Sequence, residues 1–213
     1  ARKGIVAPPL LIVGAVVVGL IVLLLATGNL NFTAKFTNNG SEQNQSSGVQ
    51  EKIKELTGSS VEMAPEPFSS SQFGFSIGYP KDWKVRSETS GVTFYLPSSA
   101  GADEADAMVI VNTAPLGELK GSKLATIADL QKVQLKKQFS GMTVVKEGAI
   151  KVGDVEAYEI EFTANIKGEN MHTRYVTLTS DTSLFGILAS ANEGMWDKYK
   201  GHLSKSLDSF KLL

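Results

Sequence analysis

The two histidines are the first residues to examine for metal or acid–base chemistry. His172 and His202 fall in separate predicted elements, and no Asp or Glu stands beside either one at ligand spacing. A zinc site needs three or four ligands that converge on one point. We therefore interpret His172 as a histidine at a turn edge and His202 as an exposed helical residue, and predict no metal site.

Carboxylates gather at two places in the chain. Asp103, Glu104 and Asp106 form a short acidic stretch, but a calcium loop needs more oxygen ligands in a fixed turn than this stretch supplies. Glu159 and Glu161 alternate along one predicted strand, as on an ordinary polar strand face. Both groups are interpreted as solvated surface.

The short motifs that mark catalysis or cofactor binding are missing from the sequence. The chain has no cysteine, which excludes thiol catalysis, thiolate metal sites and disulfides. No serine stands in a Gly-x-Ser-x-Gly elbow, and the glycines form no phosphate-binding loop. We expect no catalytic residues and no cofactor, and hence a protein that is not an enzyme.

The charges are balanced over the 213 residues, with 21 Lys and Arg against 22 Asp and Glu. Binding to nucleic acid needs a concentrated basic face, so nucleic acid is not an expected partner. The length allows one membrane anchor and one globular domain of ordinary size.

The element that must position this domain is the apolar run Ile5–Ala26, which contains no charged residue and follows Arg2 and Lys3. A helix of about 20 apolar residues crosses a bilayer. Positive flanks stay in the cytoplasm. Residues 1–28 are therefore predicted to form a cytoplasmic tip and one transmembrane helix in the cell membrane, with the C-terminal domain extracytoplasmic.

Small residues lie along the predicted membrane helix. Ala15 and Gly19 have the small-xxx-small spacing that lets a second helix approach closely, and Gly14 adjoins them. This spacing indicates self-association through the transmembrane helix.

Residues 29–67 are rich in Asn, Ser, Gln, Gly and Thr and are predicted to form a polar linker. Within it, residues 49–56 have the pattern of two helical turns, which are stable only when they dock on another element. Asn31, Asn39 and Asn44 match the acceptor pattern for N-glycosylation.

The remaining residues, 68–213, are predicted to form one α+β domain with a central antiparallel sheet. Strands are indicated by apolar alternation and bounded by turn residues. Four of them are separated by hairpin-type turns and should form an antiparallel meander. The predicted strands are 73–80, 92–97, 107–111, 143–150, 155–166, 172–180 and 183–191.

Two helices are expected to flank the sheet. The first should begin with a capping box at Thr126 and Asp129 and run to Phe139, with Val133 among its inward residues. The second, residues 194–207, carries an apolar stripe at helical spacing. Trp196 begins that stripe and is expected to be among the largest buried groups of the helix.

Four stretches of this domain form a distinctive set: Phe75–Trp83, Gly91–Tyr95, the Gly153 and Ala157-Tyr158 pairing in the first hairpin, and Ser206–Lys211. Together with the order of strands and helices, they resemble the PsbP/Mog1-like family of extracytoplasmic domains. The resemblance implies a central antiparallel sheet flanked by helices, and a family that mostly works through protein contacts without catalysis.

The expected function is that of a single-pass, membrane-anchored, non-enzymatic protein. It would act by contact with another membrane or surface protein, as an accessory subunit of a membrane or cell-surface assembly. The alternative is a pilin-like subunit of a surface filament, because Arg2-Lys-Gly before Ile5 resembles a prepilin-peptidase site. Pro9 departs from that pattern, since bacterial pilins usually carry a glutamate at this place.

Overall fold

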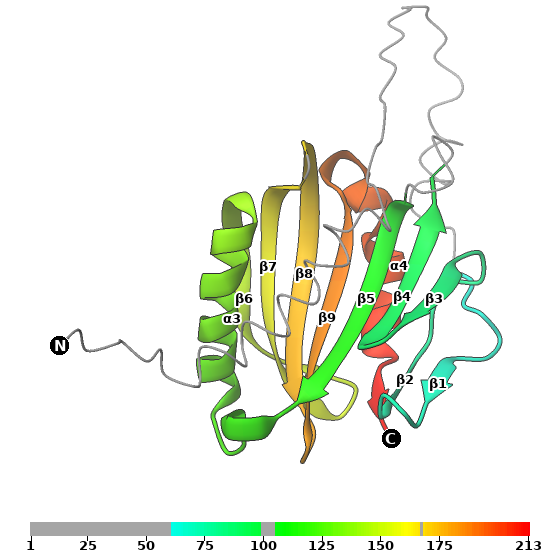
Figure 1. Ribbon diagram of the computed structural model, residues 1–213. Helices are drawn as coiled ribbons and strands as arrows, with labels where there is room; N and C mark the ends of the chain where they lie inside the picture. Colours follow the sequence, from blue (N-terminus) through cyan, green and yellow to red (C-terminus); the bar gives the residue numbers. More distant parts are fainter. Residues whose placement is uncertain (1–60, 99–104, 167) are drawn as a thin grey trace, which may run out of the picture.

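A computed structural model describes residues 61–98, 105–166 and 168–213 (Figure 1). The predicted transmembrane helix, the helix at 49–56 and the glycosylation motifs lie outside the described residues. Within the described part, no helix is long and apolar enough to cross a membrane.

The centre of the domain is an antiparallel sheet, as the sequence predicts, and it has seven strands; the strand predicted at 73–80 belongs instead to a separate small sheet. The four strands after the first helix are consecutive neighbours, so the expected meander is confirmed. The sheet order is β3-β4-β5-β9-β8-β7-β6, which leaves β3 and β6 at the edges. The strands are β3 Lys84–Glu88, β4 Gly91–Pro97, β5 Ala105–Pro115, β6 Ser140–Val152, β7 Val155–Ile166, β8 Glu169–Thr179 and β9 Ser183–Asn192.

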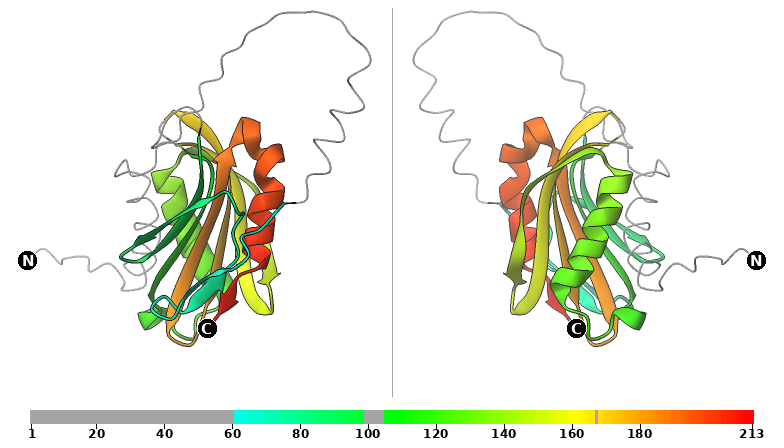
Figure 2. Two further views of the ribbon diagram at one scale, coloured as in Figure 1. Left: turned by 90° about the vertical axis from the view of Figure 1, so that its right-hand side faces the viewer. Right: turned by 90° about the vertical axis from the view of Figure 1, so that its left-hand side faces the viewer.

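Different elements lie on the two faces of this sheet (Figures 1 and 2). Helix α3, Leu124–Gln138, packs on β6, β7 and β8 on one face. Helix α4, Trp196–Asp208, lies on the other face against β9 and β5. That face also carries a small sheet, which consists of β1 Phe68–Ser70, β2 Phe75–Ile77 and β10 Lys211–Leu212. A short 3-10 helix precedes each α-helix: η1 Gly117–Leu119 before α3, and η2 Glu193–Met195 before α4.

Strand alternation divides the core between the two faces. On β7, Ala157 packs toward α4 while Ile160 and Phe162 pack toward α3. The α4 side is rich in aromatic rings, and Phe75 of the small sheet stacks on Phe210 with ring centroids 5.5 Å apart. With no disulfide in the chain, these two apolar layers hold the domain together.

Helix α3 differs from its prediction at its start and on its inward face. It begins at Leu124 after Lys123, and no side chain caps its N-terminus, so the capping box predicted at Thr126 is wrong. Val133 is 47% exposed, whereas Gln131 is fully buried. The buried residues Ile127, Ala128, Gln131 and Leu135 repeat at helical spacing, and Val133, two positions from both Gln131 and Leu135, lies on the opposite side of the helix.

Helix α4 confirms the predicted final helix, and Leu203 and Leu207 are buried against the sheet. Trp196, however, is only half-buried, so the expectation that it ranks among the largest buried groups is wrong. It stands at the first turn of the helix, where it packs against the core only in part. Trp83, in contrast, is buried in the core.

Some ordered segments went unrecognised in the sequence. Strand β3 is short and polar, and β1 and β10 have only three and two residues, so none shows a clear alternating pattern. Residues 61–67, assigned to the linker, lie against the domain. The amide of Ala64 donates to the carbonyl oxygen of Tyr79 at 2.8 Å, and Lys205 Nζ donates to the carbonyl oxygen of Val61 at 3.1 Å.

Candidate functional site

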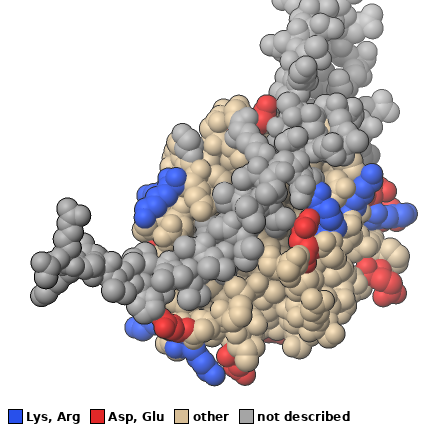
Figure 3. Space-filling view, viewed as in Figure 1, with Lys and Arg blue, Asp and Glu red and all other residues tan. Residues whose placement is uncertain are grey.

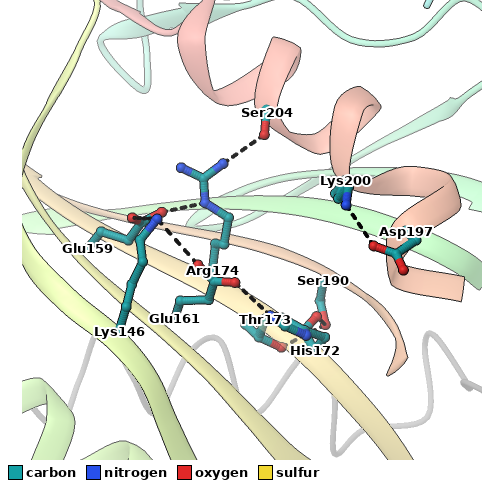
Figure 4. A network of polar contacts seen from close by, with 10 residues as sticks. All are labelled: Lys146, Glu159, Glu161, His172, Thr173, Arg174, Ser190, Asp197, Lys200 and Ser204. Atoms are coloured by element: carbon teal, nitrogen blue, oxygen red, sulfur yellow. Dashed lines mark hydrogen bonds and ion pairs between the residues drawn. The ribbon is translucent and has the colours of Figure 1, made fainter. Parts of the chain in front are cut away.

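The densest group of ionisable side chains lies on the sheet face that α4 covers (Figure 4). We call it the α4-side cluster and define it as Lys146 of β6, Glu159 and Glu161 of β7, and His172 and Arg174 of β8. Lys146, His172 and Arg174 each contact a carboxylate on the neighbouring strand. Alternation along antiparallel strands places all five side chains on one face.

Glu159 is the buried centre of the cluster, and its side chain is only 2% exposed. Arg174 Nε donates to one carboxylate oxygen, and Lys146 Nζ lies 3.2 Å from the other. Arg174 Nη1 also donates to Ser204 Oγ of α4 at 2.9 Å. The buried charge is thus paired, and the guanidinium group links the sheet to the helix.

His172 occupies the end of the cluster near the first turn of α4. Its Nε2 lies 2.7 Å from Glu161 Oε1, and its ring stacks on Trp196 with centroids 4.0 Å apart and planes within 6°. Next to it, the bond from Lys200 lowers the pKa of Asp197 from its ordinary value, and His172 contributes in the same direction. This histidine therefore fixes the start of α4 through a carboxylate and an indole.

His202 lies on α4, outside the cluster, and is half-buried instead of exposed as predicted. Its Nδ1 has no hydrogen-bond partner among the described residues. Burial lowers its pKa, and Lys205 and Lys198 act in the same direction. It lines a cleft of about 270 Å³ together with Trp83 and Leu96.

The cluster does not form a hydrolytic site. Thr173 Oγ1 and Ser190 Oγ lie 2.8 Å apart, and Ser190 also contacts the backbone oxygen of His172. Thr173 and Ser190 belong to the opposite sheet face from the His172 ring, because neighbouring strand residues point to opposite faces. The imidazole is bonded to Glu161 instead of a hydroxyl, so no nucleophile is activated here.

The structure changes the interpretation of the predicted carboxylates. Glu159 and Glu161 are parts of an ion-pair network and not ordinary solvated surface, because α4 covers the strand face that the sequence left open. Asp103 and Glu104 lie outside the described residues, and Asp106 accepts a hydrogen bond from Tyr199 Oη at 3.3 Å. In the described part of the chain, no three acidic or histidine side chains are arranged to hold a metal ion.

Lys146 and Arg174 are the members of the cluster that sequence reasoning missed. A signal was present: Glu159-Ile-Glu161 and His172-Thr-Arg174 stand on successive strands of a meander, with basic residues facing acidic ones. Opposite charges at this cross-strand spacing predict ion pairs. Among the residues predicted for packing or modification, Gly14, Ala15, Gly19, Asn31, Asn39 and Asn44 lie outside the described residues.

Charges of both signs are also interspersed over the visible face of the molecule (Figure 3). In the region not drawn grey, that view contains no continuous basic surface. The described part of this face thus gives no sign of a phosphate-backbone footprint.

The fold of this domain resembles those of several solved structures. The solution structure of cyanobacterial PsbP (CyanoP) from Synechocystis sp. PCC 6803 aligns with a TM-score of 0.54 at 14% identity, covering 74% of this chain and 96% of that one. LpqN of Mycobacterium tuberculosis, described as involved in cell envelope biogenesis, aligns with a TM-score of 0.53 at 13% identity, covering 70% and 91%. At such identities the likeness shows a shared fold.

A search of curated protein sequences finds no match to the chain. The family model PsbP, however, matches residues 64–212, which is most of the chain and nearly all of the described domain. The chain therefore belongs to the PsbP family.

Proposed function

We propose that this protein is a non-enzymatic accessory subunit that acts outside the cytoplasm by contact with another protein. The observation that carries the proposal is the α4-side cluster, whose charges are paired with one another and with α4. A catalytic centre keeps at least one ionisable group poised for substrate. This cluster instead stabilises the docking of a helix.

The proposed location rests on the apolar run Ile5–Ala26 and the basic residues before it. Family membership supports it, as the PsbP/Mog1-like resemblance implies extracytoplasmic domains that work mostly through contacts. LpqN, a protein of similar fold, is described as involved in cell envelope biogenesis.

The absence of cysteine makes the location directly testable. In intact cells, a membrane-impermeant maleimide should label Glu156→Cys, at an exposed position of β7, without permeabilisation. Lys3→Cys is the matched control and should react only after the membrane is opened. Labelling in the reverse order would contradict the proposed orientation.

The contact role predicts a stoichiometric partner. Chemical crosslinking in membranes, followed by purification of the full chain in mild detergent, should recover one heterologous protein in fixed ratio. Recovery of the chain crosslinked only to itself, with an N-terminus that begins at Ile5, would favour the pilin-like subunit instead.

A further inference from the structure

Three surface hollows of the described domain differ in the charge of their lining. The cleft at His202 also contains Lys81 and Asp82, and a hollow beside α3 and β6 contains Lys151 and Glu156. The third hollow, of about 520 Å³, has no charged side chain among the described residues that line it. Small-molecule sites typically measure about 300–1,000 Å³, so this uncharged hollow is large enough to hold a ligand.

We call the third hollow the hydroxyl groove. It lies at the lower end of the molecule in Figure 1, where the turn between β1 and β2 meets the end of β5 and the turn between β8 and β9. Its lining combines one aromatic ring and one amide with four hydroxyl groups. These groups come from Phe73, from Gln72, and from the four residues Ser71, Thr113, Thr182 and Ser183.

Backbone hydrogen bonds hold the turns around the groove. The amide of Gly74 donates to the carbonyl oxygen of Ser70 at 2.8 Å, and Gly74 has a φ of +74°, a conformation that favours glycine. On the other side, the amide of Leu116 donates to the carbonyl oxygen of Thr182 at 2.8 Å, which ties the end of β5 to the β8–β9 turn. A frame that is already ordered loses little conformational entropy when a ligand binds.

The polar side chains of the groove are largely uncommitted. Within the described part of the chain, the side chains of Ser71, Gln72 and Thr113 form no hydrogen bond. Thr182 Oγ1 and Ser183 Oγ lie 3.5 Å apart, which is long for a bond between hydroxyl groups. A hydroxyl group both donates and accepts, and an amide supplies two donors and an acceptor oxygen. The groove therefore offers both donors and acceptors to a ligand.

Phe73 supplies the aromatic part of the lining. Its ring stacks on Phe75 of the core with centroids 6.2 Å apart and an angle of 26° between the planes. The side chain is half-buried, so it is anchored in the core and still lines the groove. The face of an aromatic ring carries a partial negative charge. C–H groups beside oxygen atoms are weakly positive and pack favourably on such a ring.

This lining disfavours charged ligands and purely apolar ones. A charged group loses hydration in the groove and meets no opposite charge among the described lining residues. Asp181 adjoins Thr182 in the turn but does not line the groove. An apolar ligand covers the hydroxyl groups without bonding them, which costs free energy for each unsatisfied group. A neutral ring with hydroxyl groups on its rim and C–H groups on its faces satisfies both parts of the lining.

We infer that the hydroxyl groove binds a neutral carbohydrate. The C–H face of one sugar ring packs on Phe73, while sugar hydroxyl groups exchange hydrogen bonds with Gln72 and Thr113. This site goes beyond the proposed function, because it shares no residue with the α4-side cluster and binds a sugar whether or not the partner protein is present. The sugar can come from a polysaccharide or from the headgroup of a glycolipid, and the chemistry of recognition is the same for both.

The test uses the full chain in lipid nanodiscs, which avoids detergents with sugar headgroups. The probes are immobilised oligosaccharides of glucose, galactose, mannose or N-acetylglucosamine, with uronic-acid oligosaccharides of the same length as charged controls. At least one neutral oligosaccharide should bind above bare nanodiscs and more tightly than its charged counterpart. Competition by the free oligosaccharide indicates a polysaccharide ligand. Competition only by vesicles that display the same sugar on a lipid indicates a glycolipid.

Phe73→Leu is the diagnostic variant, because it keeps an apolar side chain but removes the ring. It should weaken binding about tenfold. Phe68→Leu is the matched control and should leave binding unchanged, since Phe68 also packs on the core from the small sheet but does not line the groove. Thr113→Val removes one hydroxyl group while keeping the shape of the side chain, and should weaken binding about fivefold.

Three results would each overturn the inference. The first is that no neutral oligosaccharide binds above bare nanodiscs, and the second is equal binding of the neutral and uronic-acid oligosaccharides. The third is unchanged binding by Thr113→Val, which decides the point even where Phe73→Leu melts at a lower temperature than Phe68→Leu. None of these results bears on the maleimide labelling or the crosslinking ratio, so the proposed function fails or stands separately.

Discussion

Glu159 shows how one residue changes meaning when a distant element covers it. On the strand alone it is a polar residue facing water, but under α4 it is a buried anion that needs its two cations. Removing one partner of a buried pair leaves an unpaired charge in a poorly solvated site.

Glu159→Leu should therefore lower the free energy of unfolding by about 3 kcal/mol, since Arg174 loses its main partner. Urea denaturation of the full chain in detergent, followed by tryptophan fluorescence, measures this change. Glu62→Ala is the control, because Glu62 pairs with Lys81 at an exposed site and its loss should not move the midpoint. Similar midpoints for both variants would show that the α4-side cluster contributes no stability.

His202 carries a pH prediction whose sign follows from its surroundings. Burial lowers its folded-state pKa, so the unfolded chain binds the proton first as the pH falls. The stability contributed by neutral His202 is complete above the unfolded pKa of about 6.5 and is lost as the pH falls toward the lower folded value. Between about pH 7.5 and pH 5, the parent should lose more stability than His202→Gln. Parallel melting profiles of the two proteins over this range would contradict the assignment.

At the scale of elements, Gly91 and Gly148 allow the same substitution to be compared at two strand positions. A Cβ on Gly91 of β4 would lie 2.0 Å from the backbone oxygen of Val111 on β5, and backbone cannot move aside as a side chain can. Gly91→Ala should cost more than about 2 kcal/mol. At Gly148 of β6 the space is open, so Gly148→Ala should be neutral or stabilise by about 0.4–1 kcal/mol. Thermal unfolding of both variants measures these changes in stability. Equal losses of stability in the two variants would contradict the close approach of β4 and β5 at Gly91.

The elements also show what could be predicted from the sequence. The meander and the last helix were predictable because Ile160 and Phe162, or Leu203 and Leu207, repeat at the period of their own element. Strand β3 was not predictable, because it is held in place by pairing with β4 and has no apolar alternation of its own. The start of α3 was missed because Thr126 has cap chemistry but lies within the first helical turn.

The cluster was less accessible to prediction than the fold. Glu159 and Glu161 were visible as a pair, but their burial depends on α4, which follows more than 30 residues later in the chain. Local periodicity gives the orientation of a side chain relative to its strand. It does not say which helix covers that face, and coverage decides between solvated surface and an ion-pair network.

At the scale of the whole molecule, the proposed arrangement is a domain on a polar tether. A flexible tether tolerates changes of length because effective concentration falls only slowly with added residues. Deleting residues 43–48 should leave membrane insertion and domain melting unchanged and alter crosslinking to the partner by less than tenfold. If the deletion abolishes assembly while the domain still melts normally, a packed role of that segment replaces the tether.

The small sheet has a consequence for the order of events during synthesis. Ser209 Oγ accepts from the amide of Gly78 at 2.8 Å, although 131 positions separate them, and β10 is a neighbour of β2. Contacts between such distant positions form late, because the intervening chain must be closed first. The aromatic layer around Phe75 therefore remains open while the ribosome is still making β6 to β9. The domain can complete its fold only after synthesis has ended, when its last strand is free to pair with β2.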